Sequence, residues 1–174
     1  MAGISANNPF KRQTCHRDKC PFKATGQDCK DTCYKSGIIY TATCSLCHED
    51  TSQAVYVGES SRSIFTRANQ HLADFSRARR TQGDQDQGQR PSNFYMDHLS
   101  EQHPDQIDAV DPKTGIRWSV IDTHRDPLSR QTMEAVYIQQ ALTSKSVQGL
   151  PGVQVHSMNR KGEYFSARER WTRD

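Results

Sequence analysis

Three short runs of β-branched and aromatic residues stand out against an otherwise polar chain. Residues 37–43 (GIIYTAT) and 53–58 (QAVYVG) are separated by a polar segment, CSLCHEDTS, and this pattern predicts two antiparallel strands joined by an elaborated loop. Residues 115–124 (GIRWSVIDTH) alternate between apolar and polar positions and predict a third strand. Tyr40 and Tyr56 therefore lie on neighbouring strands of the predicted sheet.

The chain between residues 59 and 80 changes to helical spacing. Its apolar side chains recur every three or four positions, which predicts an amphipathic helix with Ser60 or Ser61 as the N-cap. Arg67 and His71 are four residues apart, so they share one face of this helix.

Two further helices are predicted in the second half of the chain. Segment 91–103 begins with Pro91, a favourable first helical residue, and stops before the next proline. Segment 125–144 has Asp126 as its N-cap, followed by a proline and a long run of good helix formers. Glu134 lies in the middle of that helix, on the same side as apolar residues, so we expect it to be partly shielded from water.

The predicted elements make an α+β fold, a small three-stranded antiparallel sheet flanked by helices, within residues 37–174. Residues 1–36 are expected to form a flexible leader and a cysteine-rich segment whose few apolar side chains cannot order it unaided. Residues 81–90 (TQGDQDQGQR) have no hydrophobic periodicity and predict a flexible insertion. A length of 174 residues suits a chain with one real core.

Composition limits the class of protein. Hydrophobic residues make up 33% of the chain, which is low for a compact domain and implies that something besides apolar burial stabilises parts of it. The first residues form no apolar signal segment and no window approaches a membrane span, so we expect an intracellular protein with no membrane partner. Closely spaced cysteines in such a protein favour metal binding, with an extracellular disulfide scaffold as the alternative.

The cysteine and histidine spacings predict one or two structural Zn²⁺ sites. Cys44 and Cys47 form a Cys-x2-Cys, and His98 and His103 form a His-x4-His that can complete a tetrahedral site. In the alternative, the two histidines lie on a helix surface and the two cysteines pair with upstream ones. The second site would be an all-cysteine one, Cys15, Cys20, Cys29 and Cys33, and would order the polar segment.

Charge permits a nucleic-acid partner without requiring one, because the net charge is only +3. Arginine and lysine gather in two stretches, RSIFTRANQHLADFSRARR and NRKGEYFSARERWTR. The alternative interpretation is a solvated helix face and a frayed tail. The candidate phosphate contacts are Arg62, Arg77, Arg79, Arg80, Arg160 and Lys161.

The order of six residues along the chain resembles the GIY-YIG nuclease family. The first motif stands here as GIIY, with its glycine displaced by one position to Gly37, and the second stands as YVG. The matching residues are Tyr40, Tyr56, Arg67, His71, Glu134 and Asn159. Each has a plain alternative, since strand tyrosines are usually core residues, Arg67 and His71 can be an exposed face, and Glu134 can pair with Arg130.

The resemblance implies a divalent-metal-dependent endonuclease. One Mg²⁺ or Mn²⁺ would be held by Glu134, and Arg67 would stabilise charge on the phosphate in the transition state. Tyr40 would be the general base, which requires its pKa to fall well below about 10. Tyr56 and His71 would orient water and phosphate, with His71 as a competing base or proton relay. Asn159 would close the site or touch the DNA backbone.

The cysteines around the two tyrosine motifs, the following histidine pair and NRKGEY are most similar to the endonuclease domain of Penelope-like retroelements. This resemblance implies a nuclear protein that nicks DNA to prime integration, with DNA, a reverse transcriptase domain of the same polyprotein and its RNA template as partners. A prokaryotic restriction or repair nuclease of the same superfamily is another possibility. The alternative from a different class is a catalytically inactive, zinc-supported nucleic-acid-binding module, which the displaced glycine favours.

Overall fold

A computed structural model describes most of the chain between residues 15 and 157. The described residues are 15, 17, 20–27, 29, 32–47, 52–81, 93–143 and 154–157. The predicted leader and almost all of the predicted insertion at 81–90 lie outside them, apart from Thr81, which ends a helix. The division of the chain after residue 36 stays a prediction.

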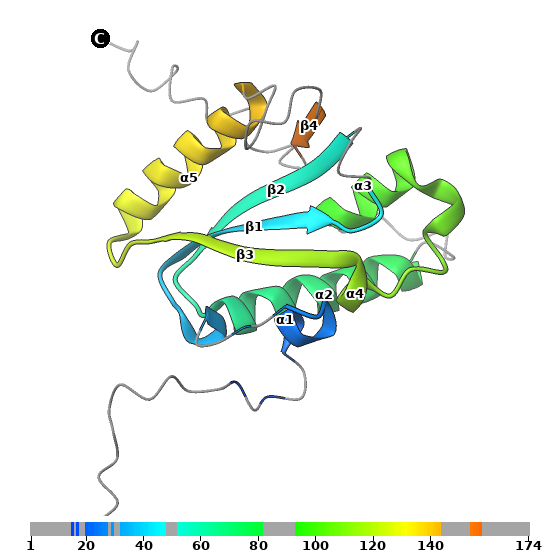
Figure 1. Cartoon of the computed structure of the whole chain (residues 1–174), viewed down its shortest axis with the longest axis horizontal. Helices are drawn as coiled ribbons and strands as arrows, with labels where there is room; N and C mark the ends of the chain where they lie inside the picture. Colours follow the sequence, from blue (N-terminus) through cyan, green and yellow to red (C-terminus); the bar gives the residue numbers. More distant parts are fainter. Residues whose placement is uncertain are drawn as a thin grey trace, which may run out of the picture.

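The sheet contains the three predicted strands (Figure 1). Strand β1 (Ile38–Cys44) lies between β2 (Ser52–Ser60) and β3 (Ile116–Thr123) and is antiparallel to both, which confirms a small three-stranded antiparallel sheet within a mixed helix and strand fold. A short fourth strand, β4 (Gln154–Ser157), pairs in parallel with the first half of β2. The sequence pattern does not predict this strand, because edge pairing gives the polar segment backbone partners that its own residues do not indicate.

Three longer helices accompany the sheet. They are α2 (Ile64–Thr81), α3 (Phe94–Gln102) and α5 (Pro127–Thr143). The shorter ones are α1 (Pro21–Ala24), α4 (Pro112–Gly115) and the 3₁₀ turns η1 (Thr32–Tyr34) and η2 (Pro104–Gln106). Helix α5 lies on one side of the sheet and α1 and α2 lie on the other (Figure 1). No helix in the described part of the chain combines the length and apolar character needed to cross a membrane.

Side-chain hydrogen bonds at the helix starts correct two predicted caps. Ser63 Oγ, not Ser60 or Ser61, accepts from the backbone N–H of a residue in the first turn of α2, at 3.3 Å. Asn93 caps α3 through two backbone N–H groups, so this helix begins three residues after Pro91. The first backbone N–H groups of a helix need an acceptor immediately before its first turn. Ser63 and Asn93 stand at that position, whereas Ser60, Ser61 and Pro91 lie two or three residues too early. The Asp126 cap of α5 is confirmed at 2.6 Å.

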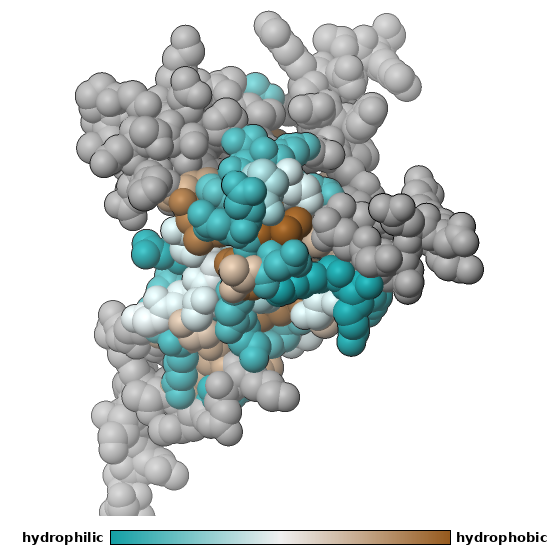
Figure 2. Space-filling view, turned by 90° about the vertical axis from the view of Figure 1, so that its right-hand side faces the viewer, coloured by the Kyte–Doolittle hydropathy of each residue, from teal (hydrophilic) through white to brown (hydrophobic). Residues whose placement is uncertain are grey.

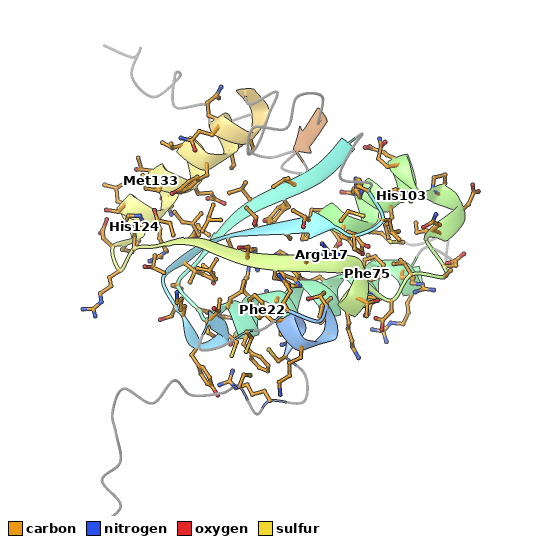
Figure 3. The ribbon with its side chains drawn as sticks, in the orientation of Figure 1. Phe22, Phe75, His103, Arg117, His124 and Met133 are labelled. Atoms are coloured by element: carbon orange, nitrogen blue, oxygen red, sulfur yellow. The ribbon has the colours of Figure 1, made fainter. Side chains whose placement is uncertain are left out.

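Alternation along β1 divides the core into two layers. Ile38, Tyr40 and Ala42 face the larger layer, which contains α2, α3 and the cysteine-rich segment, whereas Ile39 faces the smaller one, beneath α5. Figure 3 shows Phe22 and Phe75 on the α2 side of the sheet and Met133 on the α5 side. The space-filling view is mostly hydrophilic over its described residues, with hydrophobic side chains exposed only in small areas (Figure 2).

Candidate functional site

Four of the predicted site residues converge on the α2 side of the sheet. In the β1–β2 register Tyr40 is opposite Gly58 and Tyr56 is opposite Ala42, so the tyrosines are diagonal neighbours on one face, with ring centroids 6.1 Å apart. His71 Nε2 lies 2.7 Å from Tyr40 Oη, and Arg67 Nε donates to the same oxygen at 3.1 Å. One phenol oxygen therefore contacts both helix residues.

Gly58 makes room for this contact. A Cβ at this position would lie 2.7 Å from Tyr40 Oη and 2.8 Å from Tyr56 Cε1. Only a residue without a side chain lets the Tyr40 ring lie flat across the neighbouring strand. Glycine is required at position 37, the displaced glycine of the first motif, for a different reason. Its φ is +62°, and a Cβ there would meet the His124 carbonyl oxygen at 2.6 Å.

Burial determines the protonation of the two central groups. It raises the pKa of the Tyr40 phenol well above its usual value, and the nearby Tyr56 adds to this effect while Arg67 opposes it. The lowered Tyr40 pKa that the resemblance requires is therefore not a property of the metal-free protein. Burial, and then the Arg67 charge, lower the pKa of His71 to about 3, so its ring is neutral near pH 7. Because Arg67 donates to the Tyr40 oxygen, the hydroxyl proton can be donated to His71 Nε2 in the tautomer protonated on Nδ1.

Glu134 lies on α5, on the other side of the sheet from α2 (Figure 1), and interacts electrostatically with Arg67 and Tyr56. It is half-buried, and burial followed by the charge of Glu59 raises its pKa to about 7, whereas a hydrogen bond with the Glu59 backbone and the charge of Arg67 lower it. Among the described residues β4 pairs with β2 from Ser52 to Val55, whereas Glu134 interacts with the backbone of Glu59, in the later part of β2. Arg130 binds Glu59 at 2.7 Å, so the alternative that Arg130 serves as the salt-bridge partner of Glu134 is wrong.

Two aromatic side chains that sequence reasoning did not select enclose the tyrosines and the histidine. Phe94 stacks on Tyr56, with centroids 4.1 Å apart and planes 16° apart, and meets His71 edge-on at 5.0 Å. Trp118 lies 5.8 Å from His71 and 6.0 Å from Tyr40. Trp118 could have been found from strand alternation, because β3 pairs it with Ala42 on the tyrosine face. Phe94 has no such signal, since its position depends on how α3 packs.

Both predicted groups of metal ligands come together. Cys44 and Cys47, at the end of β1 and just beyond it, meet His98 of α3 and His103, which directly follows that helix. The four ligand atoms all lie within 4.8 Å of one another. Cys47 Sγ is 3.4 Å from Nε2 of each histidine. Tetrahedral zinc, with its usual bond lengths, requires a sulfur to nitrogen separation of about 3.5 Å. This group could hold zinc, and the helix-surface alternative for the two histidines is wrong.

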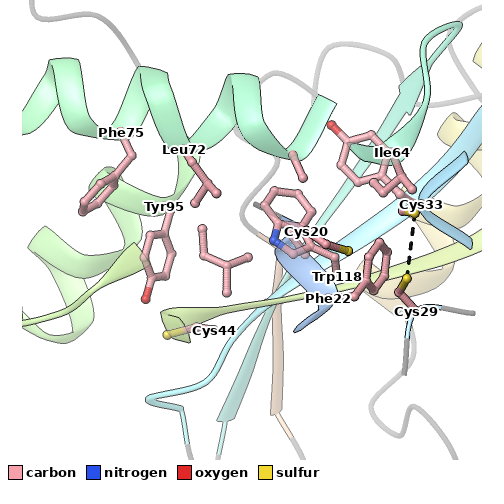
Figure 4. Packing of buried hydrophobic residues seen from close by; sticks show 14 of the residues in the cluster. Cys20, Phe22, Cys29, Cys33, Cys44, Ile64, Leu72, Phe75, Tyr95 and Trp118 are labelled. Atoms are coloured by element: carbon pink, nitrogen blue, oxygen red, sulfur yellow. Dashed lines mark hydrogen bonds between the residues drawn. The ribbon is translucent and has the colours of Figure 1, made fainter. Parts of the chain in front are cut away.

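The cysteine-rich segment forms the second group. Its four sulfurs, from Cys15, Cys20, Cys29 and Cys33, also lie within 4.8 Å of one another and are buried. The Cys29 and Cys33 sulfurs are 3.8 Å apart, as the dashed line in Figure 4 marks, and two thiolates on one tetrahedral zinc are separated by about 3.8 Å. None of the six cysteines forms a disulfide, so the structure contains no disulfide scaffold.

Contacts from the cysteine-rich segment reach the site. The Gln27 side chain donates to the Trp118 carbonyl at 3.2 Å and accepts from the Trp118 N–H at 3.4 Å, completing the edge of β3 as a paired strand would. The Arg17 guanidinium lies over the rings of Tyr34 and Phe65, at 4.5 and 4.2 Å. The segment is thus fastened both to β3 and to α2.

Among the predicted phosphate contacts that the structure describes, Arg62 lies apart from the other three. Arg62 is exposed just before α2, whereas Arg77 and Arg80 are exposed near its end, about 22–27 Å farther along the helix. Arg77 pairs with Asp74 at 3.2 Å, and Arg79 donates to the Asp108 and Val110 carbonyls. Asn159, Arg160 and Lys161 lie outside the described residues.

Comparison with protein-family models, with curated proteins and with solved structures finds no match for this chain. The interpretation of the site therefore depends on its own geometry and on the order of its residues in the sequence.

Proposed function

We propose that this chain is a divalent-metal-dependent DNA endonuclease of the GIY-YIG type, which hydrolyses phosphodiester bonds. The observation that carries the proposal is the meeting of Arg67 and His71 at the Tyr40 hydroxyl, with Tyr56 beside it and Glu134 within electrostatic range of Arg67. A general base, a fixed cation and a carboxylate are the groups that phosphodiester hydrolysis needs.

A Tyr40–His71 relay accounts for base catalysis despite the raised pKa of the phenol. The Tyr40 hydroxyl is fully buried in the free protein, so this mechanism requires DNA binding to give the attacking water access to it. Tyr40 then takes a proton from that water as it passes its own proton to His71 Nε2, so no free phenolate forms. The water oxygen bonds to phosphorus, and the leaving oxygen takes the electrons of the broken bond. Negative charge on the phosphate oxygens then faces Arg67, which is always protonated, and also favours the imidazolium of His71.

Glu134 is the residue that would hold Mg²⁺ or Mn²⁺. Its environment fits such an ion, because burial and the neighbouring Glu59 disfavour the ionised carboxylate, and a cation would relieve that cost. When bound, the ion supplies Lewis-acid polarisation of the phosphate. Glu134 belongs to neither group of clustered metal ligands among the described residues, so most ligands of this ion would be water and substrate oxygens.

The retroelement origin is a finer proposal that depends on the sequence resemblance. One active site cuts one strand, so the product would be a nick whose 3′ end primes reverse transcription by a partner domain on its RNA template, in the nucleus. The set that the resemblance pairs with this origin, Cys44, Cys47, His98 and His103, is assembled and could hold zinc.

The alternative function is a zinc-supported nucleic-acid-binding module that has lost catalysis. The displaced Gly37 was its main support, but this residue satisfies a positive φ and a close contact with His124, away from the Tyr40 hydroxyl. The binding module is therefore kept only as an outcome of the experiment.

Nicking of supercoiled plasmid with Mg²⁺ or Mn²⁺ tests the proposal. We expect conversion to open circle by the wild type and a loss of at least about 100-fold in Glu134→Ala and Arg67→Ala, as for other removed transition-state contacts. Arg125→Ala, which removes an exposed arginine that is not among the candidate phosphate contacts, is the control and should nick normally. Folded, zinc-loaded wild type that binds DNA but leaves every plasmid intact would establish the binding module instead.

A further inference from the structure

Helix α3 connects one metal group to the tyrosine and histidine cluster. Its first residue, Phe94, stacks on Tyr56 at 4.1 Å and meets His71 edge-on at 5.0 Å. Four residues later, His98 faces the cysteines of β1, and His103 follows directly after the helix ends. One turn of a rigid helix therefore separates the aromatic contact from the first metal ligand, a rise of about 6 Å.

The beginning of α3 is fastened to α2. Asn93 accepts two backbone N–H groups of α3 through its side-chain oxygen, while its side-chain nitrogen donates to the His71 backbone carbonyl at 3.4 Å. Core packing of Tyr95, Met96 and Leu99 holds the middle of the helix, so only its exact angle remains to be fixed. The metal ligands His98 and His103 are a further attachment at the other end, which would fix that angle.

We infer that Phe94 is a positioning residue for Tyr56 and His71, and that zinc bound by Cys44, Cys47, His98 and His103 fixes Phe94 there by clamping α3 to the end of β1. The inference deepens the proposed nuclease function and uses its site, but the geometric part can be tested without cleavage.

The packing of α3 explains why zinc would adjust the site rather than create it. Tyr95, Met96 and Leu99 are buried in the larger core, and the Tyr95 hydroxyl donates to the Gly115 carbonyl at 3.0 Å. These contacts keep the helix attached when the metal leaves. The half-buried Phe94 ring, by contrast, depends on the angle of the helix, so loss of zinc should move it off Tyr56 while the fold survives.

The first arm of the test compares Phe94→Leu with Phe65→Leu. Phe65 is also half-buried at the edge of the larger core, but it contacts Arg17 instead of the site. The readouts are the NMR signals of the His71 and Tyr56 rings, which the stacked Phe94 ring shifts, and the nicking rate. We expect Phe94→Leu to move both signals and lower kcat about tenfold with little change in KM, and Phe94→Tyr to restore them, while Phe65→Leu alters neither.

The second arm removes the metal. His103→Ala should lose one zinc per chain and move the same two ring signals in the same direction as Phe94→Leu. If that variant does not fold, a stepwise chelator titration of the wild type, followed through the same signals, makes the comparison.

The outcomes separate this inference from the proposed function. Ring signals that stay in place in Phe94→Leu, or that stay in place when zinc leaves the Cys44 group, would overturn the inference even if the wild type nicks DNA. A wild type that does not nick, but whose signals respond as described, would overturn the nuclease proposal and leave the zinc and Phe94 coupling standing. Full nicking by Phe94→Leu would overturn the positioning role.

Discussion

Gly58→Ala is the substitution whose effect the geometry defines most closely. The added methyl group would lie 2.7 Å from Tyr40 Oη, 2.8 Å from Tyr40 Cζ and 2.8 Å from Tyr56 Cε1, whereas ordinary contact begins at 3.4 Å. The tyrosine rings must therefore retreat from the strand by about 0.7 Å to reach a normal carbon contact distance. Tyr40 cannot do this without stretching its contacts with His71 and Arg67.

Gly58→Ala should lower both the stability of the fold and the rate of nicking. Overpacking of a filled core site costs about 1–3 kcal/mol of unfolding free energy. Displacement of a catalytic group by about 1 Å costs about 100-fold in rate, because the reacting atoms leave their near-attack distance. The fold should therefore survive with reduced stability, while nicking falls by about two orders of magnitude.

Gly26→Ala is the matched control for this prediction. Gly26 has a φ of +71° and open space around its Cα, so alanine there strains the backbone by about 1–2 kcal/mol without touching Tyr40. Urea unfolding, zinc content and plasmid nicking would be measured on both variants. Normal nicking by Gly58→Ala at a stability similar to that of Gly26→Ala would refute the idea that the glycine is required by the Tyr40 hydroxyl.

Three further predictions concern metals, charge and pH. The denatured, chelated protein should release two zinc ions and show six free thiols without reductant, whereas a count of none would point to disulfides. Arg130→Met should destabilise the fold by about 2–3 kcal/mol in urea unfolding, because Glu59 is left as a partly buried unpaired charge. Its control, Arg77→Met, breaks an exposed pair with Asp74 and should cost less than about 0.5 kcal/mol. The His71 pKa falls from 6.5 to about 3 on folding, so between these pH values the unfolded chain binds more protons than the folded one. The free energy of unfolding should therefore drop as pH falls from 6.5 to 3. His71→Gln should weaken this drop, and an unchanged slope would contradict the low His71 pKa.

The two groups of metal ligands could be predicted from sequence because few residue types bind zinc. Thiolates and imidazoles at zinc-finger spacings have few other uses in a chain without disulfides, and both predicted sets assemble. The two strands that carry Tyr40 and Tyr56 could also be predicted from the sequence, since alternation and β-branched residues specify strands locally. The long α2 and α5 helices followed from apolar spacing for the same reason.

The predictions that failed depended on contacts between distant segments. The caps at Ser63 and Asn93 required knowing which polar side chain actually reaches a free N–H. Strand β4 forms by pairing with the distant strand β2, and the raised pKa of Tyr40 in the metal-free protein is a consequence of its complete burial. None of these quantities is a property of a short window of sequence.

The sequence by itself determined the local elements, the ligand types of two metal groups and the order of the candidate site residues, because periodicity and donor chemistry are read within a few residues. Only the tertiary structure decided that Gly58 lies under the Tyr40 hydroxyl, that Phe94 and Trp118 enclose His71, and that burial keeps the phenol protonated. Those features arise from packing and desolvation, which depend on which distant segments meet and how completely they exclude water.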